Sequence, residues 1–166
     1  MIIRALHPVQ DRAQVDAFFQ DARDYITLER GEAPGPAVTE EFFTDTPPGC
    51  DPDASLRIGL FDGARLIALA ETGFGFPEPD DAYLGLMIIS PAARGKGAGA
   101  RLLRHIEGEA IARACKAIYL AVLEANPRGR AFWEREGFTT ILTDRPVTLG
   151  TKTQMARRMG KTLSAS

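Results

Sequence analysis

The chain has 166 residues and a formal net charge of −2, with 45% hydrophobic and 25% charged residues. This length suits one domain with a substantial core, spanning residues 1–166, and is too short for two ordinary domains. The composition is that of a globular protein, and no apolar run is long enough to cross a bilayer. The N-terminus lacks the basic region and long apolar stretch of a signal peptide, so we expect a cytoplasmic protein without membrane contact.

Charge is divided unevenly along the chain. Residues 1–83 carry 16 acidic and 6 basic side chains, a net charge of −10, whereas residues 84–166 carry 6 acidic and 14 basic side chains, a net charge of +8. A basic half suits a polyanionic ligand and an acidic half suits a cationic one, although ordinary solvated faces would produce the same counts. The acidic half would repel phosphates, so we do not expect nucleic acid as a partner.

The two cysteines exclude two classes of small protein. Cys50 and Cys115 fit neither a metal-binding spacing nor a disulfide framework. We therefore expect two reduced thiols and no metal site.

Periodicity and turn residues predict the elements of the first half. In chain order they are a strand over 1–5, an amphipathic helix from Pro8 to about Tyr25, a short helix over 38–44, and strands over 56–61 and 66–72. The first helix is predicted from apolar side chains at helical spacing, such as Val15, Phe18 and Phe19. The Asp62-Gly63 pair predicts a hairpin turn between the two strands.

The second half alternates strands with helices. In chain order the predicted elements are a strand over 82–89, a helix whose apolar face runs from Leu102 to Ala114, a strand over 117–123, a helix over 128–136, and strands over 138–142 and 153–159. The strand over 82–89 is nearly all apolar, which is typical of a strand buried on both faces. These elements predict an α/β domain with a mixed sheet.

A phosphate-binding loop is predicted between Leu84 and Leu103, where the apolar strand enters a basic, glycine-rich turn that opens onto a helix. Glycines let backbone N–H groups approach one point, and the first helical turn adds unpaired donors and the positive end of its dipole. Arg94 and Lys96 reinforce the positive charge. The segment therefore predicts a ligand that carries phosphate.

Two nucleotide-binding motifs fit this loop poorly. A nucleotide P-loop needs Ser or Thr after its lysine, and Lys96 is followed by Gly97. Gly95, Gly97 and Ala100 match the dinucleotide pattern, with Glu124 at the end of the next strand as the ribose carboxylate. In that fold the strand feeds straight into the first glycine, whereas five residues intervene here. The dinucleotide-binding enzyme remains as an alternative.

A third motif fits better, and the chain resembles the GNAT superfamily of N-acetyltransferases. The signature Arg/Gln-x-x-Gly-x-Gly/Ala stands here as Arg94-Gly-Lys-Gly97-Ala-Gly99, after the expected strand and proline. The later run Asn-x-x-Ala-x-x-Phe-Tyr-x-x-x-Gly-Phe stands as residues 126–138, with Gly129 in place of alanine and Trp133 in place of tyrosine. The resemblance is close over residues 82–141, and residues 1–55 carry no motif that we can place.

The resemblance implies a mixed, mostly antiparallel sheet with a V-shaped split between two parallel central strands, flanked by helices. It implies an acetyl-CoA-binding core over residues 81–142 and an acceptor-side half over residues 1–80. The positions carried over as cofactor contacts are Met87, Ile88, Ile89, Arg94, Gly95, Lys96, Gly97, Ala98, Gly99, Ala100, Asn126, Phe132 and Trp133. Asn126 serves equally well as a turn residue before Pro127, and Phe132 as a core residue.

The implied reaction moves an acetyl group from acetyl-CoA directly to a primary amine in a ternary complex. A backbone N–H near Met87 would stabilise the oxyanion, which is typically worth about 3 kcal/mol. Glu71 is the first candidate for the base that deprotonates the amine and Glu124 is the second, although a strand-end carboxylate that faces solvent is the favoured interpretation of Glu71. Many family members protonate the leaving thiolate with a tyrosine. The indole of Trp133 cannot release a proton, so we expect water to do so, with Tyr83 and Tyr119 as weaker candidates.

We expect a small, cationic acceptor on the acidic half. The acceptor-side residues that we single out are Tyr25, Glu29, Glu32, Glu40, Glu41, Asp45 and the loop over residues 47–53, with Phe74 and Phe76 as an apolar wall. A catalytically weak acyl-CoA-binding regulatory module remains as an alternative, because Trp133 removes the usual acid. Homodimers are common among similar proteins, and the sequence marks no interface.

Overall fold

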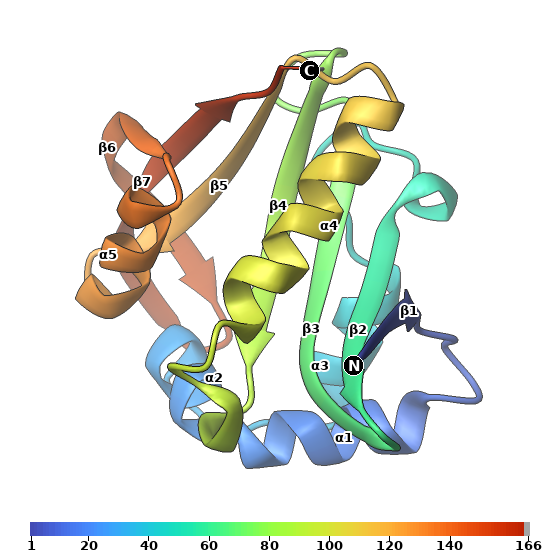
Figure 1. Ribbon diagram of the computed structural model, residues 1–166. Helices are drawn as coiled ribbons and strands as arrows, with labels where there is room; N and C mark the ends of the chain where they lie inside the picture. Colours follow the sequence, from blue (N-terminus) through green and yellow to red (C-terminus); the bar gives the residue numbers. More distant parts are fainter. Residues whose placement is uncertain (165–166) are drawn as a thin grey trace.

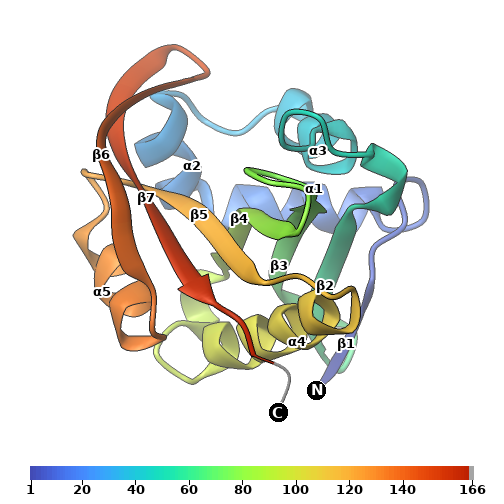
Figure 2. The same cartoon turned by 90° about the horizontal axis from the view of Figure 1, so that it is seen from above.

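The computed structural model describes residues 1–164 and consists of one seven-stranded sheet with helices on both faces (Figures 1 and 2). Its elements are β1 (Ile2–Ala5), α1 (Arg12–Asp21), α2 (Arg23–Arg30), α3 (Pro36–Thr44), β2 (Leu56–Asp62), β3 (Arg65–Phe74), β4 (Asp81–Ile89), α4 (Ala98–Ala112), β5 (Ala117–Leu123), α5 (Pro127–Arg135), β6 (Thr139–Leu149) and β7 (Lys152–Thr162). Short 3₁₀ turns at Pro52–Ala54 and Pro91–Ala93 precede β2 and α4.

The strand order is β1-β2-β3-β4-β5-β7-β6. Each neighbouring pair is antiparallel except β4 and β5, which are parallel and are joined through α4. A parallel pair needs such a crossover connection because its strands cannot be joined by a tight turn. The expected mixed, mostly antiparallel sheet is therefore confirmed.

Helices cover both faces of this sheet (Figure 2), and a hydrophobic core lies beneath them on each face. On one face α4 buries Leu102, Leu103 and Ile106 against side chains of β2 to β5. On the other face α1, α2 and α3 bury an aromatic cluster that includes Phe19 and Phe42. The sheet is thus covered on both sides, and this packing holds its strands in place up to the point where β4 and β5 separate.

The prediction of a single helix from Pro8 to about Tyr25 is wrong in one respect, because the structure has two helices in this region. α1 ends at Asp21 and α2 begins at Arg23, and Ala22 between them has a φ of −93° and a ψ of 25°. The apolar spacing continues through the break from Val15 to Ile26, so periodicity alone could not reveal the change of direction. The bend brings α2 to the edge of the β4–β5 split, which Figure 1 shows.

The final hairpin is longer than the sequence predicts. β6 and β7 each have 11 residues, whereas we expected strands over 138–142 and 153–159. Most of β6 is exposed, so it carries no buried alternation by which its length could be recognised. The extended hairpin reaches α2, where Gln154 Nε2 donates to the carbonyl oxygens of Leu28 and Glu29 at 2.9 and 3.1 Å.

No helix within residues 1–164 is long and apolar enough to span a membrane. Over the same residues, no three or more His, Cys, Asp or Glu side chains are grouped so that they could hold a metal ion.

Candidate active site

The parallel strands β4 and β5 separate after three residue pairs. Asp81, Ala82 and Tyr83 pair with the first three residues of β5, and no pair follows. Alternate residues of an antiparallel strand turn their N–H and C=O groups away from the partner, so the free edge of β4 presents backbone groups to the gap. We expected β4 to be buried on both faces, and this is wrong beyond Tyr83, because Leu86 and Met87 line the opening and are only partly buried.

A β-bulge at Gly85 bends β4 where the split begins. The neighbours Glu71 and Thr72 of β3 pair with Leu86 and Leu84, which leaves Gly85 as the extra residue. A Cβ at Gly85 would overlap Glu71 Oε2. The glycine therefore lets the Glu71 carboxylate lie directly against the strand that carries Met87. A glycine within an apolar strand is a recognisable sign of such a bulge, and the sequence analysis missed it.

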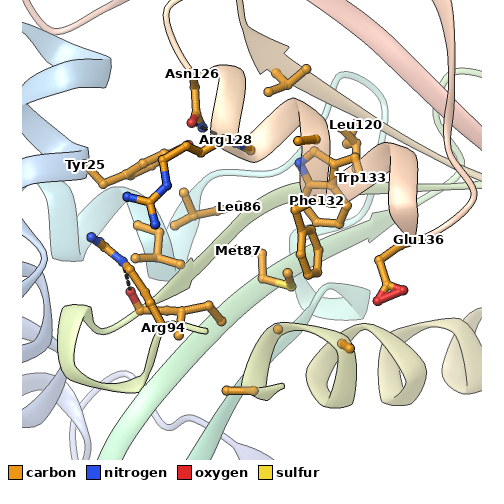
Figure 3. Close-up of a pocket in the computed structure, with 18 of the residues that line it drawn as sticks. Tyr25, Leu86, Met87, Arg94, Leu120, Asn126, Arg128, Phe132, Trp133 and Glu136 are labelled. Carbon is orange, nitrogen blue, oxygen red and sulfur yellow. Dashed lines mark hydrogen bonds between the residues drawn. The ribbon is translucent and has the colours of Figure 1, made fainter. Parts of the chain in front are cut away.

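A cleft of about 860 Å³ follows the split on one side of the sheet (Figure 3). Of the thirteen expected cofactor contacts, the structure brings twelve to its wall, namely Met87, Ile88, Ile89, Arg94, Gly95, Gly97, Ala98, Gly99, Ala100, Asn126, Phe132 and Trp133. Lys96 is exposed and does not line the cleft. The two motifs, separated in sequence, thus form opposite walls of one cavity.

The glycine-rich loop presents backbone rather than side chains to this cleft. Gly95 and Gly97 have φ angles of +74° and +84°, which favour glycine, and open space surrounds the position of a Cβ at both. Gly97 directly precedes α4, whose N-terminus has no side-chain cap. The N–H groups of the first helical turn have no intrahelical partner, so they can bind an anion.

Two arginines at the cleft differ in their partners, because Arg94 is paired with an acid and Arg128 extends into the open space. Arg94 donates through Nη1 and Nη2 to Asp24 of α2 at 2.6 and 3.1 Å, and this contact lowers the pKa of Asp24. Arg128 extends from the first turn of α5 into the cleft in Figure 3. Sequence analysis missed Arg128, although its place inside the second motif was a usable signal.

The opposite wall is built by α5. Asn126 caps this helix, since its Oδ1 accepts a hydrogen bond from the Gly129 N–H at 3.0 Å. A Cβ at position 129 would overlap Asn126 Nδ2, so alanine there would require the Asn126 amide to shift. The rings of Phe132 and Trp133 meet edge to face with centroids 4.9 Å apart. Trp133 is 9% exposed and also packs on Phe138, so it is both a core residue and a wall of the cleft.

A second cavity of about 330 Å³ opens on the other side of the split. Its apolar lining comes from α2, α3, β5 and the final hairpin, and includes Ile26, Val38, Phe42, Leu123, Val147 and Leu149. Its charged lining consists of Glu29, Arg30, Glu41, Asp45 and Glu71. Arg30 Nη2 lies 2.5 Å from Glu41 Oε2, so one basic side chain faces four carboxyl groups. The cavity is therefore acidic, with apolar walls that are partly aliphatic and partly aromatic.

Glu71 is the most perturbed acid that faces this cavity. It is only 6% exposed, and its Oε1 has no hydrogen-bond partner in the described structure. Burial raises the pKa of Glu71 from 4.5 to about 7, against the opposing effect of Arg57. Arg57 itself donates to backbone carbonyl groups, among them that of Phe42 at 2.8 Å. A buried carboxylate that titrates near neutral pH can accept a proton from a substrate.

The comparisons with known proteins agree with this geometry. The family model described as the acetyltransferase (GNAT) family matches residues 16–138. The chain belongs to the GNAT family. This family uses acetyl-CoA as the acetyl donor. A search of curated protein sequences found no match.

Solved structures of GNAT proteins share the fold over nearly the whole chain. An acetyltransferase from Thermus thermophilus aligns with a TM-score of 0.79 and 21% identity, covering 98% of this chain and 96% of its own. The ribosomal-protein-S18-alanine N-acetyltransferase from Escherichia coli aligns with a TM-score of 0.73 and 19% identity, covering 99% and 95%. The PaiA N-acetyltransferase from Thermoplasma acidophilum, solved in complex with coenzyme A, aligns with a TM-score of 0.71 and 17% identity, covering 97% and 98%.

Some residues singled out in the sequence lie away from both cavities of this GNAT protein. Glu124 is exposed and accepts hydrogen bonds from Arg157 Nε and Nη2 at 2.8 and 2.9 Å, which lower the pKa of Glu124. Phe74 lies under the Arg113 guanidinium, and Phe76 packs on Tyr83, so neither ring lines the second cavity. Glu32 and Glu40 are also outside its lining.

Proposed function

We propose that this GNAT protein transfers the acetyl group of acetyl-CoA to a primary amine of a small cationic molecule, by direct attack in a ternary complex. One observation carries the proposal. A cleft walled by the glycine-rich loop and an acidic cavity meet at the β4–β5 split, where Tyr25, Gly85, Leu86 and Ala121 line both. A donor and an acceptor held on the two sides would meet there.

The residues of the larger cleft fit acetyl-CoA. The amides from Gly95 to Ala100 suit its pyrophosphate, and Arg128 adds charge of the correct sign, whereas Arg94 is paired with Asp24. The unpaired edge of β4 suits an extended amide-bearing arm, in the manner of an added strand. Bound there, acetyl-CoA supplies an activated thioester near Met87.

The chain's own groups then perform three tasks. The cavity walls orient the amine toward the split, which lowers the entropic part of the barrier. Glu71 accepts a proton from the attacking amine, directly or through water. A backbone N–H on the free edge of β4 near Met87 donates to the oxygen on which negative charge develops.

The acceptor cavity favours an aliphatic diamine. Its volume of about 330 Å³ suits a small molecule, and its walls suit an alkyl chain. Glu71 lies at the split, whereas Glu41 and Asp45 remain for a second ammonium group, with Arg30 opposing them. An anionic acceptor would meet repulsion from these carboxylates.

A panel of amines tests this proposal through the release of free CoA thiol. We expect kcat/KM to be largest for alkyl diamines and at least about tenfold lower for monoamines of equal length, because the second ammonium loses its charged partners. Amino acids should react more slowly still, since their carboxylates face the acidic cavity. No thiol release with any amine would reject the transfer, and equal rates for diamines and amino acids would reject the cationic acceptor.

A further inference from the structure

The junction of the two cavities contains one side chain that can donate a proton. Four residues line both cavities, and the reacting atoms must lie near them because the acetyl group passes from one cavity to the other. Gly85, Leu86 and Ala121 have no side-chain proton to give. The phenol of Tyr25, from α2, extends into the cleft at this point (Figure 3).

The other aromatic side chains with an O–H or N–H group do not lie at the junction of the two cavities. Tyr83 lines only the acceptor cavity, and its ring packs on Phe76 with centroids 5.1 Å apart. Tyr119 lines neither cavity and lies under Gly160. Trp133 lines the cleft, but its indole N–H is a hydrogen-bond donor and does not release its proton. Of the three tyrosines in the chain, only Tyr25 lines the larger cleft, in which we propose that acetyl-CoA binds.

A second acidic side chain, that of Glu29, is close to Tyr25 on the same helix. Glu29 lies one turn later on α2, lines the acceptor cavity and is 9% exposed. Burial raises the pKa of Glu29 and Glu41 adds to the effect, while Tyr25 and Arg30 oppose it. Burial, with the neighbouring Glu29 carboxyl, likewise raises the pKa of Tyr25 well above its ordinary value. Both shifts favour the uncharged, protonated forms of the two side chains.

The final hairpin holds α2 in the required position. The Thr151 N–H donates to the Arg30 carbonyl oxygen at 3.1 Å, and Gln154 Nε2 donates to the carbonyl oxygens of Leu28 and Glu29. These bonds satisfy carbonyl groups at the C-terminal end of the helix, which otherwise have no intrahelical partner. The position of Tyr25 is thus determined by tertiary contacts rather than by a flexible loop.

We propose that Tyr25 protonates the sulfur of the departing CoA and that Glu29 returns a proton to Tyr25, an inference that depends on the acetyl transfer proposed above. The carbon–sulfur bond breaks with its electron pair going to sulfur, and the Tyr25 hydroxyl supplies the proton that makes the free thiol. The phenolate recovers a proton from the Glu29 carboxyl. Glu71 holds the proton lost by the amine, and because Glu71 and Glu29 line the same cavity, water within it returns that proton to Glu29.

Binding measurements test the contact with sulfur without requiring turnover. CoA and desulfo-CoA, which lacks the sulfur, are titrated calorimetrically into the wild-type protein and into Tyr25→Phe and Tyr119→Phe. At a pH of about 9, above the ordinary pKa of a thiol near 8.5, we expect Tyr25→Phe to weaken binding of CoA about tenfold and to leave desulfo-CoA unchanged. Tyr119→Phe, outside both cavities, should bind both ligands as the wild type does.

Steady-state kinetics test the proton transfer itself. We expect Tyr25→Phe to lower kcat about 100-fold, with KM for acetyl-CoA within about twofold of the wild type. Glu29→Gln should lower kcat by a smaller factor of about ten, because solvent can return the proton more slowly. Equal weakening of CoA and desulfo-CoA, or an unchanged kcat in Tyr25→Phe, would overturn the inference. A wild-type protein that binds CoA but acetylates no amine would reject the proposed function, while a sulfur-dependent loss in Tyr25→Phe would still establish the contact.

Discussion

Glu71 is the single residue whose chemistry depends most on burial. Its Oε1 has no hydrogen-bond partner in the described structure, and its pKa is about 7. For these reasons we propose Glu71 as the group that accepts the proton of the amine. Because the ionised form is the active one, kcat/KM of the wild type should rise with pH until about pH 7 and then level off. We expect Glu71→Gln to lower kcat/KM about 100-fold and to remove this dependence, as measured by pH profiles of thiol release. An unchanged profile would eliminate Glu71 as the base.

The same carboxyl should reduce the stability of the folded protein at neutral pH. Its pKa rises from 4.5 to about 7 on folding, so between these values the folded state binds more protons than the unfolded chain. Stability from this group is therefore present at low pH and is lost as the pH rises toward 7. In urea titrations at about pH 8, Glu71→Gln should be more stable than the wild type by at most about 3 kcal/mol. At about pH 4 the difference should vanish.

At the scale of one element, the loop before α4 needs glycine because of its backbone conformation. It does not need glycine for lack of room for a larger side chain. Gly97 and Gly49 both have left-handed φ angles, +84° and +77°, and nothing lies within 4 Å of a Cβ at either position. Alanine at either site should therefore cost a similar strain of about 1 kcal/mol in urea titrations. Only Gly97→Ala should also weaken CoA binding, by about tenfold in calorimetry, because its amide belongs to the anion site that we propose. Equal CoA affinity in the two variants would contradict the role of the loop.

Across the whole molecule, the two halves of the chain carry net charges of opposite sign. The half with a net charge of +8 contains the glycine-rich loop, and the half with −10 supplies the four carboxyl groups of the acceptor cavity together with Arg30. Raising NaCl from about 0.05 M to about 0.5 M should therefore raise KM for both acetyl-CoA and a diamine, by about threefold or more. Sucrose of equal osmolarity is the control, and KM values that do not respond to salt would contradict this electrostatic account.

Local patterns in the sequence predicted much of the fold and both walls of the larger cleft. The glycine-rich motif and the Asn126 run indicate the cofactor cleft, because they specify backbone conformation within a few residues. Gly85 and Arg128 also lay within reach of such reasoning. The break at Ala22 did not, since the apolar spacing is the same on both sides of it, and neither did the length of the exposed strand β6.

Residues close together in the chain were enough to indicate the family, the mixed sheet and the anion-binding loop. By contrast, tertiary packing decides which acidic side chains can take part in the proposed reaction. Glu71 is buried beside Gly85 and faces the acceptor cavity, whereas Glu124 is exposed and paired with Arg157. Only the fold could bring Tyr25 to the junction of the two cavities, because that position depends on the bend after α1 and on contacts with a hairpin more than 100 residues later in the chain. Burial and the pKa changes that it causes arise from packing between distant segments, and no local pattern predicts them.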